Sequence, residues 1–161
     1  MQKHSTLNCP ATVLPYADSV FDTTRNYLMA AALQQLEMVR YYVESEGLHP
    51  DTTLESKPTA LCYAALKGNY RLMRYLLNKG ADVNRTDALA MTPLHYAVLG
   101  GCLICISLLI GHGAALNAVN YQGQTPLRLS GDRQHPTLKR ELLERHGARE
   151  DSGVPAIACF H

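Results

Sequence analysis

Two cysteines at C-x-x-C spacing follow a histidine closely in the middle of the chain. Cys102 and Cys105 flank Leu103 and Ile104, and His95 precedes them. A C-x-x-C pair at the start of a helix can form a redox dithiol or half of a metal site, because the helix N-terminus stabilises a thiolate. A histidine can act as an acid, a base or a metal ligand. This stretch could therefore carry redox, metal or catalytic chemistry.

The rest of the sequence supplies few of the groups that such chemistry needs. No second C-x-x-C and no correctly spaced pair of histidines completes a zinc site. Catalysis by His95 would need a nucleophile and an orienting carboxylate, and no motif provides either. The glycines form no phosphate-binding loop. We therefore expect no cofactor, no metal and no enzymatic activity, and we keep a redox or metal role of Cys102 and Cys105 as an alternative.

The elements that position these residues repeat every 33 residues. Thr59, Thr92 and Thr125 each open a similar phrase, namely TALCYAA, TPLHYAV and TPLRLSG. Glycines recur in the same step, with one residue inserted before the last of them. A fixed period of this length is typical of a solenoid of stacked units. In this register Cys105 matches Leu72, a core position, so the period favours a structural role for the cysteines.

The copy that begins at Thr92 has the residue types of two short helices. The Thr92 hydroxyl can cap the first helix, and Pro93 suits its first position because proline lacks an amide hydrogen. Gly100 and Gly101 are expected to break this helix. Gly113 is placed to end the second helix in the left-handed conformation. A pair of this size cannot bury its own apolar face, so neighbouring copies must stack.

The end copies are expected to be more polar, because one side of each faces water rather than another unit. In the fourth copy, Pro136 is expected to start a second helix over 137–145. We assign the charged residues of this helix to a solvent-facing side, namely Lys139, Arg140, Glu141, Glu144 and Arg145.

The phrases TPLHYAV, LLNKGADVN and LLIGHGAALN resemble the ankyrin repeat family, whose unit of about 33 residues carries a T-P-L-H-x-A signature. The resemblance covers roughly residues 23–149 and is strongest in the third copy. It implies an all-α solenoid of about four helix-turn-helix units with short, β-hairpin-like loops. It also implies that His95 is a neutral ring that joins backbone groups of adjacent repeats.

This resemblance divides the chain into three parts. We expect an N-terminal extension over 1–24, a repeat domain over 25–149 and a tail over 150–161. The repeats are placed near 26–58, 59–91, 92–124 and 125–149.

The resemblance further implies the binding of another protein through loop tips and the exposed side of the first helices. Leu89 and Met91 flank Ala90, where the family usually has glycine, and Tyr121 lies in the next loop. Exposed apolar and aromatic residues close together are typical of a binding hot spot. In the alternative interpretation Leu89 folds back onto its neighbouring loop. The expected partner contacts are Glu55, Lys67, Leu89, Met91, Leu99, Tyr121, Gln122 and Gln124.

Composition sets the class of partner and the compartment. A net charge of +1 gives no reason to expect nucleic acid or a membrane surface. The densest positive run, from Lys67 to Arg85, is interpreted as a solvated helix face. No apolar run approaches the ~18 residues of a membrane span. An odd number of cysteines favours a reducing compartment. We expect a cytoplasmic monomer that acts as an adaptor or inhibitor, or alternatively a bacterial effector that captures a host protein.

One modification site follows from the same resemblance. The stretch from Leu76 to Asn84 resembles the ankyrin sequence that asparaginyl hydroxylases modify, which makes Asn84 a candidate for hydroxylation. The alternative is that the Asp-Val-Asn motif only stabilises its loop through bonds from side chain to backbone.

Overall fold

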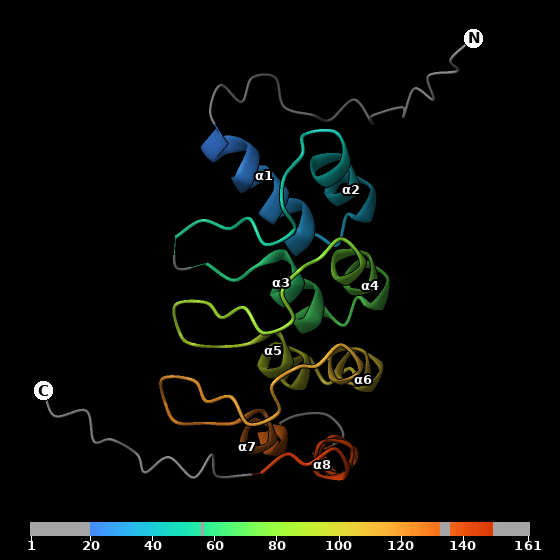
Figure 1. The fold of residues 1–161 in the computed structure, drawn as a ribbon. Coiled ribbons are helices and arrows are strands. Elements are labelled where there is room, and N and C mark those ends of the chain that lie inside the picture. The colour runs from blue at the N-terminus through green and yellow to red at the C-terminus, as the bar shows by residue number, and fades with distance from the viewer. Residues whose placement is uncertain (1–19, 56, 133–135, 150–161) are drawn as a thin grey trace, which may run out of the picture.

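The fold comes from a computed structural model, which describes residues 20–55, 57–132 and 136–149. In these residues four pairs of helices follow one another (Figure 1). The tail expected over 150–161 and most of the extension expected over 1–24 lie outside the described residues. The helices are α1 (Val20–Ala32), α2 (Leu36–Glu44), α3 (Ala60–Lys67), α4 (Tyr70–Asn78), α5 (Pro93–Gly100), α6 (Leu103–Gly111), α7 (Pro126–Leu129), the 3-10 helix η1 (Ser130–Asp132) and α8 (Pro136–Arg145).

The first helices of the pairs stack in one row and the second helices in another. The row of α1, α3, α5 and α7 runs beside the row of α2, α4, α6 and α8, and three long loops extend to one side (Figure 1). The described residues contain no strand, so the expected all-α solenoid is confirmed. Helix α1 begins at Val20, earlier than the first copy of the period, so part of the expected extension is helix.

Threonines start three of the first helices, as expected. The hydroxyls of Thr59, Thr92 and Thr125 each accept a hydrogen bond from the backbone N–H three residues later. Each bond satisfies one of the N–H groups that a helix start leaves without a partner. The Thr-Pro or Thr-Ala step therefore sets where each first helix begins.

Gly100 has a second role beyond ending its helix. It is the last residue of α5, and Gly101 caps the helix with a φ of 77°. A Cβ on Gly100 would lie 2.9 Å from the carbonyl carbon of Leu66 and 3.0 Å from the carbonyl oxygen of Ala65. Helix α5 therefore approaches the end of α3 through this glycine. The pair ends the helix as expected, and Gly100 in addition allows this close approach.

One apolar core runs through the whole stack, from Tyr27 in α1 to Ala148 after α8. Its alanines allow close helix packing, since Ala64, Ala65 and Ala97 are all fully buried. Because each unit contributes to this core, no helix pair buries its apolar face alone.

The expectation that Lys139 faces solvent is wrong, because its side chain is fully buried. The inserted residue before Gly147 shifts the fourth unit by one, so Lys139 occupies the core position of Cys105 and Leu72. Its Nζ donates a hydrogen bond to the carbonyl oxygen of Val98 at 3.2 Å, in the last turn of α5. The carbonyl end of a helix carries partial negative charge, which favours an ammonium there.

Side chains at equivalent positions also join successive loops. The Asp51 carboxylate accepts hydrogen bonds from the Asp82 N–H at 2.9 and 3.1 Å. The Asn84 Oδ1 accepts one from the Ala115 N–H at 2.7 Å, and Asn117 repeats the bond one unit later. These bonds fix the spacing of the loops that carry the candidate functional residues.

Candidate functional site

Asp87 holds the loop that carries Leu89. Its Oδ1 accepts hydrogen bonds from the N–H groups of Leu89 and Met91, each at 2.9 Å. Its Oδ2 accepts one from the Tyr96 hydroxyl at 2.5 Å. Burial, reinforced by this bond and the carboxylate charge, raises the pKa of Tyr96, so the hydroxyl remains a donor. The loop is thus tied to α5 at its base.

Asn120 does the same for the next loop. Its Oδ1 accepts hydrogen bonds from the N–H groups of Gln122 and Gln124, each at 2.9 Å. The Tyr121 N–H donates to the carbonyl oxygen of Leu89 at 3.1 Å, which joins the two loops directly. Because both loops are held by internal bonds and by each other, their tips form one preorganised surface.

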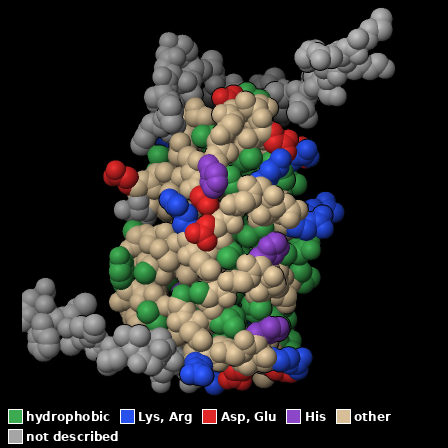
Figure 2. Space-filling model, in the orientation of Figure 1, with side chains coloured by type: hydrophobic (Ala, Val, Ile, Leu, Met, Phe, Trp, Pro, Cys, Tyr) green, Lys and Arg blue, Asp and Glu red, His purple; other side chains and the backbone are tan. Residues whose placement is uncertain are grey.

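Leu89 and Tyr121 are the exposed apolar residues of this surface, with 61% and 77% of their surface accessible. The alternative in which Leu89 folds back onto its neighbouring loop is therefore wrong. Figure 2 shows hydrophobic side chains along the left edge of the molecule, where Figure 1 places the loop tips. A hollow of about 240 Å³, which we call the C-terminal hollow, lies beside them. It is lined by Leu89, Met91, Leu99, Asn120, Tyr121, Gln122, Gln124 and Leu129.

Met91 does not have the exposure that the sequence suggested. Only 8% of its surface is accessible, because it lies at the base of its loop just before the helix cap. The Asn120 Nδ2 donates to its sulfur at 3.4 Å. Met91 thus forms part of the floor of the C-terminal hollow, and Leu89 and Tyr121 form the raised edge.

The structure brings together six of the eight expected contact residues. Glu55 and Lys67 are exposed, but neither lines this hollow. Glu55 belongs to an earlier loop, and Lys67 ends α3. Sequence reasoning missed Asp87 and Asn120, whose common position 33 residues apart and Asx chemistry could have indicated loop-organising residues.

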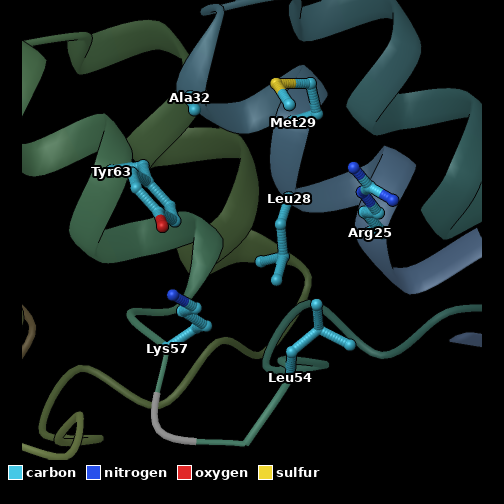
Figure 3. A pocket seen from close by; sticks show the side chains of 7 residues that line it. All are labelled: Arg25, Leu28, Met29, Ala32, Leu54, Lys57 and Tyr63. Atoms are coloured by element: carbon cyan, nitrogen blue, oxygen red, sulfur yellow. The ribbon is translucent and has the colours of Figure 1, made fainter. Parts of the chain in front are cut away.

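A second hollow, of about 400 Å³, lies between α1, α3 and the long loop that joins α2 to α3. We call it the N-terminal hollow. Figure 3 shows its lining residues, with Leu28 of α1 and Leu54 of the loop pointing toward one another. The exposed side chains of Arg25 and Lys57 add positive charge. The lining consists of Arg25, Leu28, Met29, Ala32, Leu54, Lys57 and Tyr63. Sequence reasoning did not identify this site, because the first copy keeps only the spacing of the motif.

His95 joins two units through both ring nitrogens. Nδ1 accepts a hydrogen bond from the Thr92 N–H at 3.1 Å, and Nε2 lies 3.1 Å from the carbonyl oxygen of Gln124. These partners require the neutral ring with its proton on Nε2. Burial lowers the pKa of His95, which also favours the neutral form. The bridge holds the loop of Gln124 against the start of α5.

The comparison with known families agrees with this geometry. Residues 61–110, which run from α3 to α6, match the family described as ankyrin repeats (many copies). This segment is thus similar to ankyrin repeats. A comparison with curated proteins found no match.

The two cysteines of the third unit have structural roles in helix α6. Cys102 is the N-cap of α6, and its sulfur accepts a hydrogen bond from the Cys105 N–H at 3.3 Å. Cys105 is fully buried, and burial raises the pKa of its thiol. A raised pKa disfavours the reactive thiolate. Within the described part of the chain, no three His, Cys, Asp or Glu side chains are placed to hold a metal ion.

The basic run from Lys67 to Arg85 lies only in part on outer helix α4, which contains Arg71 and Arg74 and is capped by Lys79. Lys79 forms an ion pair with Glu44 of α2 at 3.1 Å and lies over the Tyr75 ring. Arg74 similarly lies over the Tyr70 ring. These contacts fit a solvated helix face. None of the helices in the described residues has the length and apolar character of a membrane span.

Proposed function

We propose that this ankyrin repeat protein binds another protein through the surface formed by Leu89, Leu99 and Tyr121 around the C-terminal hollow. Ankyrin repeats are in general modules for protein–protein interaction. The observation that carries the proposal is the hydrogen bond between Leu89 and Tyr121, which places two exposed apolar side chains on adjoining loops.

The energetics of this surface favour tight contact with an apolar side chain. Asp87 and Asn120 fix the loops before a partner arrives, so little conformational entropy is lost on binding. A large aromatic side chain beside a hollow is the usual composition of a hot spot. The lining has no charged side chain, so the anchor of the partner is apolar, with hydrogen bonds to the amides of Gln122 and Gln124.

The proposed activity is binding alone, as an adaptor or as an inhibitor that covers a surface of its partner. The side chains around the hollow are amides, a phenol and aliphatic groups, and none of them is a nucleophile activated by a base. The captured protein could be recruited to a third component or blocked, and the same surface serves either outcome.

The test compares capture by wild type with capture by the double variant Leu89→Ser and Tyr121→Ser. Wild type should retain a partner from lysate that can be identified by mass spectrometry and then bound again in purified form. The double variant should lose that binding while its thermal unfolding stays unchanged, because both side chains are exposed. A large loss of stability would instead place these residues in the core.

A matched control uses exposed apolar residues of the outer helices. Ile104 of α6 and Leu138 of α8 have 65% and 50% of their surface accessible. The variants Ile104→Ser and Leu138→Ser remove similar apolar surface and should bind the partner as wild type does. If they lose binding equally, the loop surface is not the contact site.

We also propose Asn84 as a site of hydroxylation, as the resemblance implies. Its side chain is exposed and bridges to the next loop through Ala115 and Gly113. Incubation with an asparaginyl hydroxylase should add one oxygen to the intact mass, and the variant Asn84→Ala should prevent the addition. An unchanged mass of the wild-type protein would refute this site.

A further inference from the structure

The N-terminal and C-terminal hollows are equivalent features of the repeat, two units apart. Leu54 and Asn120 line one hollow each and are separated by 66 residues, which is two periods. The same separation relates Tyr63 and Leu129, which also line one hollow each. Equivalent positions of a solenoid face the same side, so both hollows open on the side of the loops and the first helices.

The unit between them has its own side chains at the same positions. Tyr96 lies one period after Tyr63, and Asp87 lies one period after Leu54. Their hydrogen bond of 2.5 Å joins the loop to α5 there. This side of the stack, which we call the loop face, therefore has an apolar hollow toward each end and, between them, the Asp87 carboxylate with the Tyr96 hydroxyl bound to it.

The two hollows differ in charge. Arg25 and Lys57 line the N-terminal hollow, no carboxylate is among its lining residues, and neither cation forms an ion pair with any described residue. In Figure 3 the Lys57 ammonium points toward the Tyr63 hydroxyl at the hollow's edge. The lining of the C-terminal hollow is uncharged. The loop face thus has a positive hollow at one end and a neutral hollow at the other.

We propose that the partner presents an extended segment with two apolar anchors about six residues apart, and that acidic residues flank the anchor at the α1 end. The anchors fill the two hollows, and the acidic side chains face Arg25 and Lys57. Beyond the acidic residues that directly flank this anchor, the segment between the anchors is free of acid, because it passes over Asp87. This inference rests on the proposed function, since one anchor occupies the hollow beside Leu89.

The spacing follows from helix packing. Helices pack at about 8–10 Å, so two units place the hollows about 16–20 Å apart. An extended chain covers about 3.3 Å per residue, so about five or six residues span the distance. Two anchors at this spacing add their affinities only if one segment reaches both hollows.

The probe is a fluorescein-labelled peptide with the sequence DELDGSGSLG, and its neutral counterpart is NQLNGSGSLG. Fluorescence anisotropy measures binding to the full chain, and two-dimensional amide NMR shows which residues the peptide contacts. A reversed peptide, GLSGSGDLED, allows for the opposite chain direction. One of the two acidic peptides should bind and shift amide signals around both hollows.

The charge requirement is tested with Arg25→Gln and Lys57→Gln together. This variant should bind the acidic peptide about fivefold more weakly, because each exposed ion pair contributes modestly. The matched control is Arg71→Gln with Arg74→Gln on outer helix α4, which removes the same charge and should leave binding unchanged. The neutral peptide should bind wild type as weakly as the acidic peptide binds the first variant, and added salt should remove the difference.

Several outcomes would overturn the inference. Equal affinity for acidic and neutral peptides would remove the role of Arg25 and Lys57. Shifts confined to the C-terminal hollow would refute the second anchor and leave the proposed function standing. Shifts confined to the N-terminal hollow, or no binding by any peptide, would also refute the two-anchor segment, and the Leu89 and Tyr121 variant then decides the proposed function separately. If the wild-type protein associates with itself and the Arg25→Gln, Lys57→Gln variant does not, the occupant of the two hollows is a second copy of this chain instead.

Discussion

Replacing Gly100 with alanine should force apart the two helices that it allows to meet. The new methyl group would lie 3.0 Å from the carbonyl oxygen of Ala65 and 2.9 Å from the carbonyl carbon of Leu66. Ordinary contacts between carbon and carbonyl oxygen are about 3.3–3.6 Å. Both neighbours belong to the backbone of α3 and cannot rotate away as a side chain would. Helix α5 must therefore move by several tenths of an ångström or more.

The expected loss of stability is about 2 kcal/mol. Overpacking of a tight site costs about 1–3 kcal/mol, and a rigid backbone neighbour places this site at the upper end. The greater helix propensity of alanine offsets up to about 1 kcal/mol. For a chain of this size 1 kcal/mol corresponds to about 2–4 °C, so the melting temperature should fall by about 4–8 °C.

Gly111 provides the matched control, because it also ends a helix and no atom lies within 4 Å of the position of its Cβ. Gly111→Ala should therefore raise stability slightly, by about 0.5 kcal/mol, through helix propensity alone. Urea unfolding followed by far-ultraviolet circular dichroism measures both variants, and equal m-values would show that the same structure unfolds. If Gly100→Ala is as stable as Gly111→Ala, α3 and α5 do not approach as described.

Three further sets of substitutions test other parts of the structure. Folding lowers the pKa of His95, so the unfolded chain binds a proton first as the pH falls below about 6.5. The free energy of unfolding should therefore decline with falling pH. Urea titrations of His95→Asn should show a smaller decline. Ala90 has a φ of 56°, so Ala90→Gly should raise the melting temperature by about 2 °C, whereas Ala115→Gly should lower it. Lys139→Met should lower the free energy of unfolding by about 1–3 kcal/mol because a buried hydrogen bond is lost. Lys139→Ala should lower it further because it also leaves a cavity. Unchanged urea midpoints for both variants would refute the burial of the Lys139 side chain against Val98.

The sequence was sufficient for features that repeat in each unit. The threonine caps and the start of α8 at Pro136 follow from local chemistry at known positions of the period, whereas the bridging role of His95 was implied by the family resemblance. The exposure of Leu89 and Tyr121 follows from their place at loop tips. Such features depend on a residue and its near neighbours, so a pattern of residue types contains enough information to predict them.

The errors and omissions concern residues whose environment comes from another unit. Met91 is covered by Asn120 of the next loop, and Lys139 is buried because one inserted residue moves it into the core position of the fourth unit. Gly100 is required by the backbone of α3, more than thirty residues earlier in the chain. A local pattern of residue types contains no information on how closely such a residue approaches another unit.

By itself, the sequence determined the period and the helix pairs, and it favoured a structural role for the cysteines and the histidine that first suggested chemistry. Only the tertiary structure placed Arg25, Leu54, Lys57 and Tyr63 around one hollow and related it to the hollow beside Leu89. The physical reason is that stacking brings a helix of one unit against the loop of the next. The burial and charge of the residues that line these hollows depend on how the units pack, and spacing along the chain does not specify that packing.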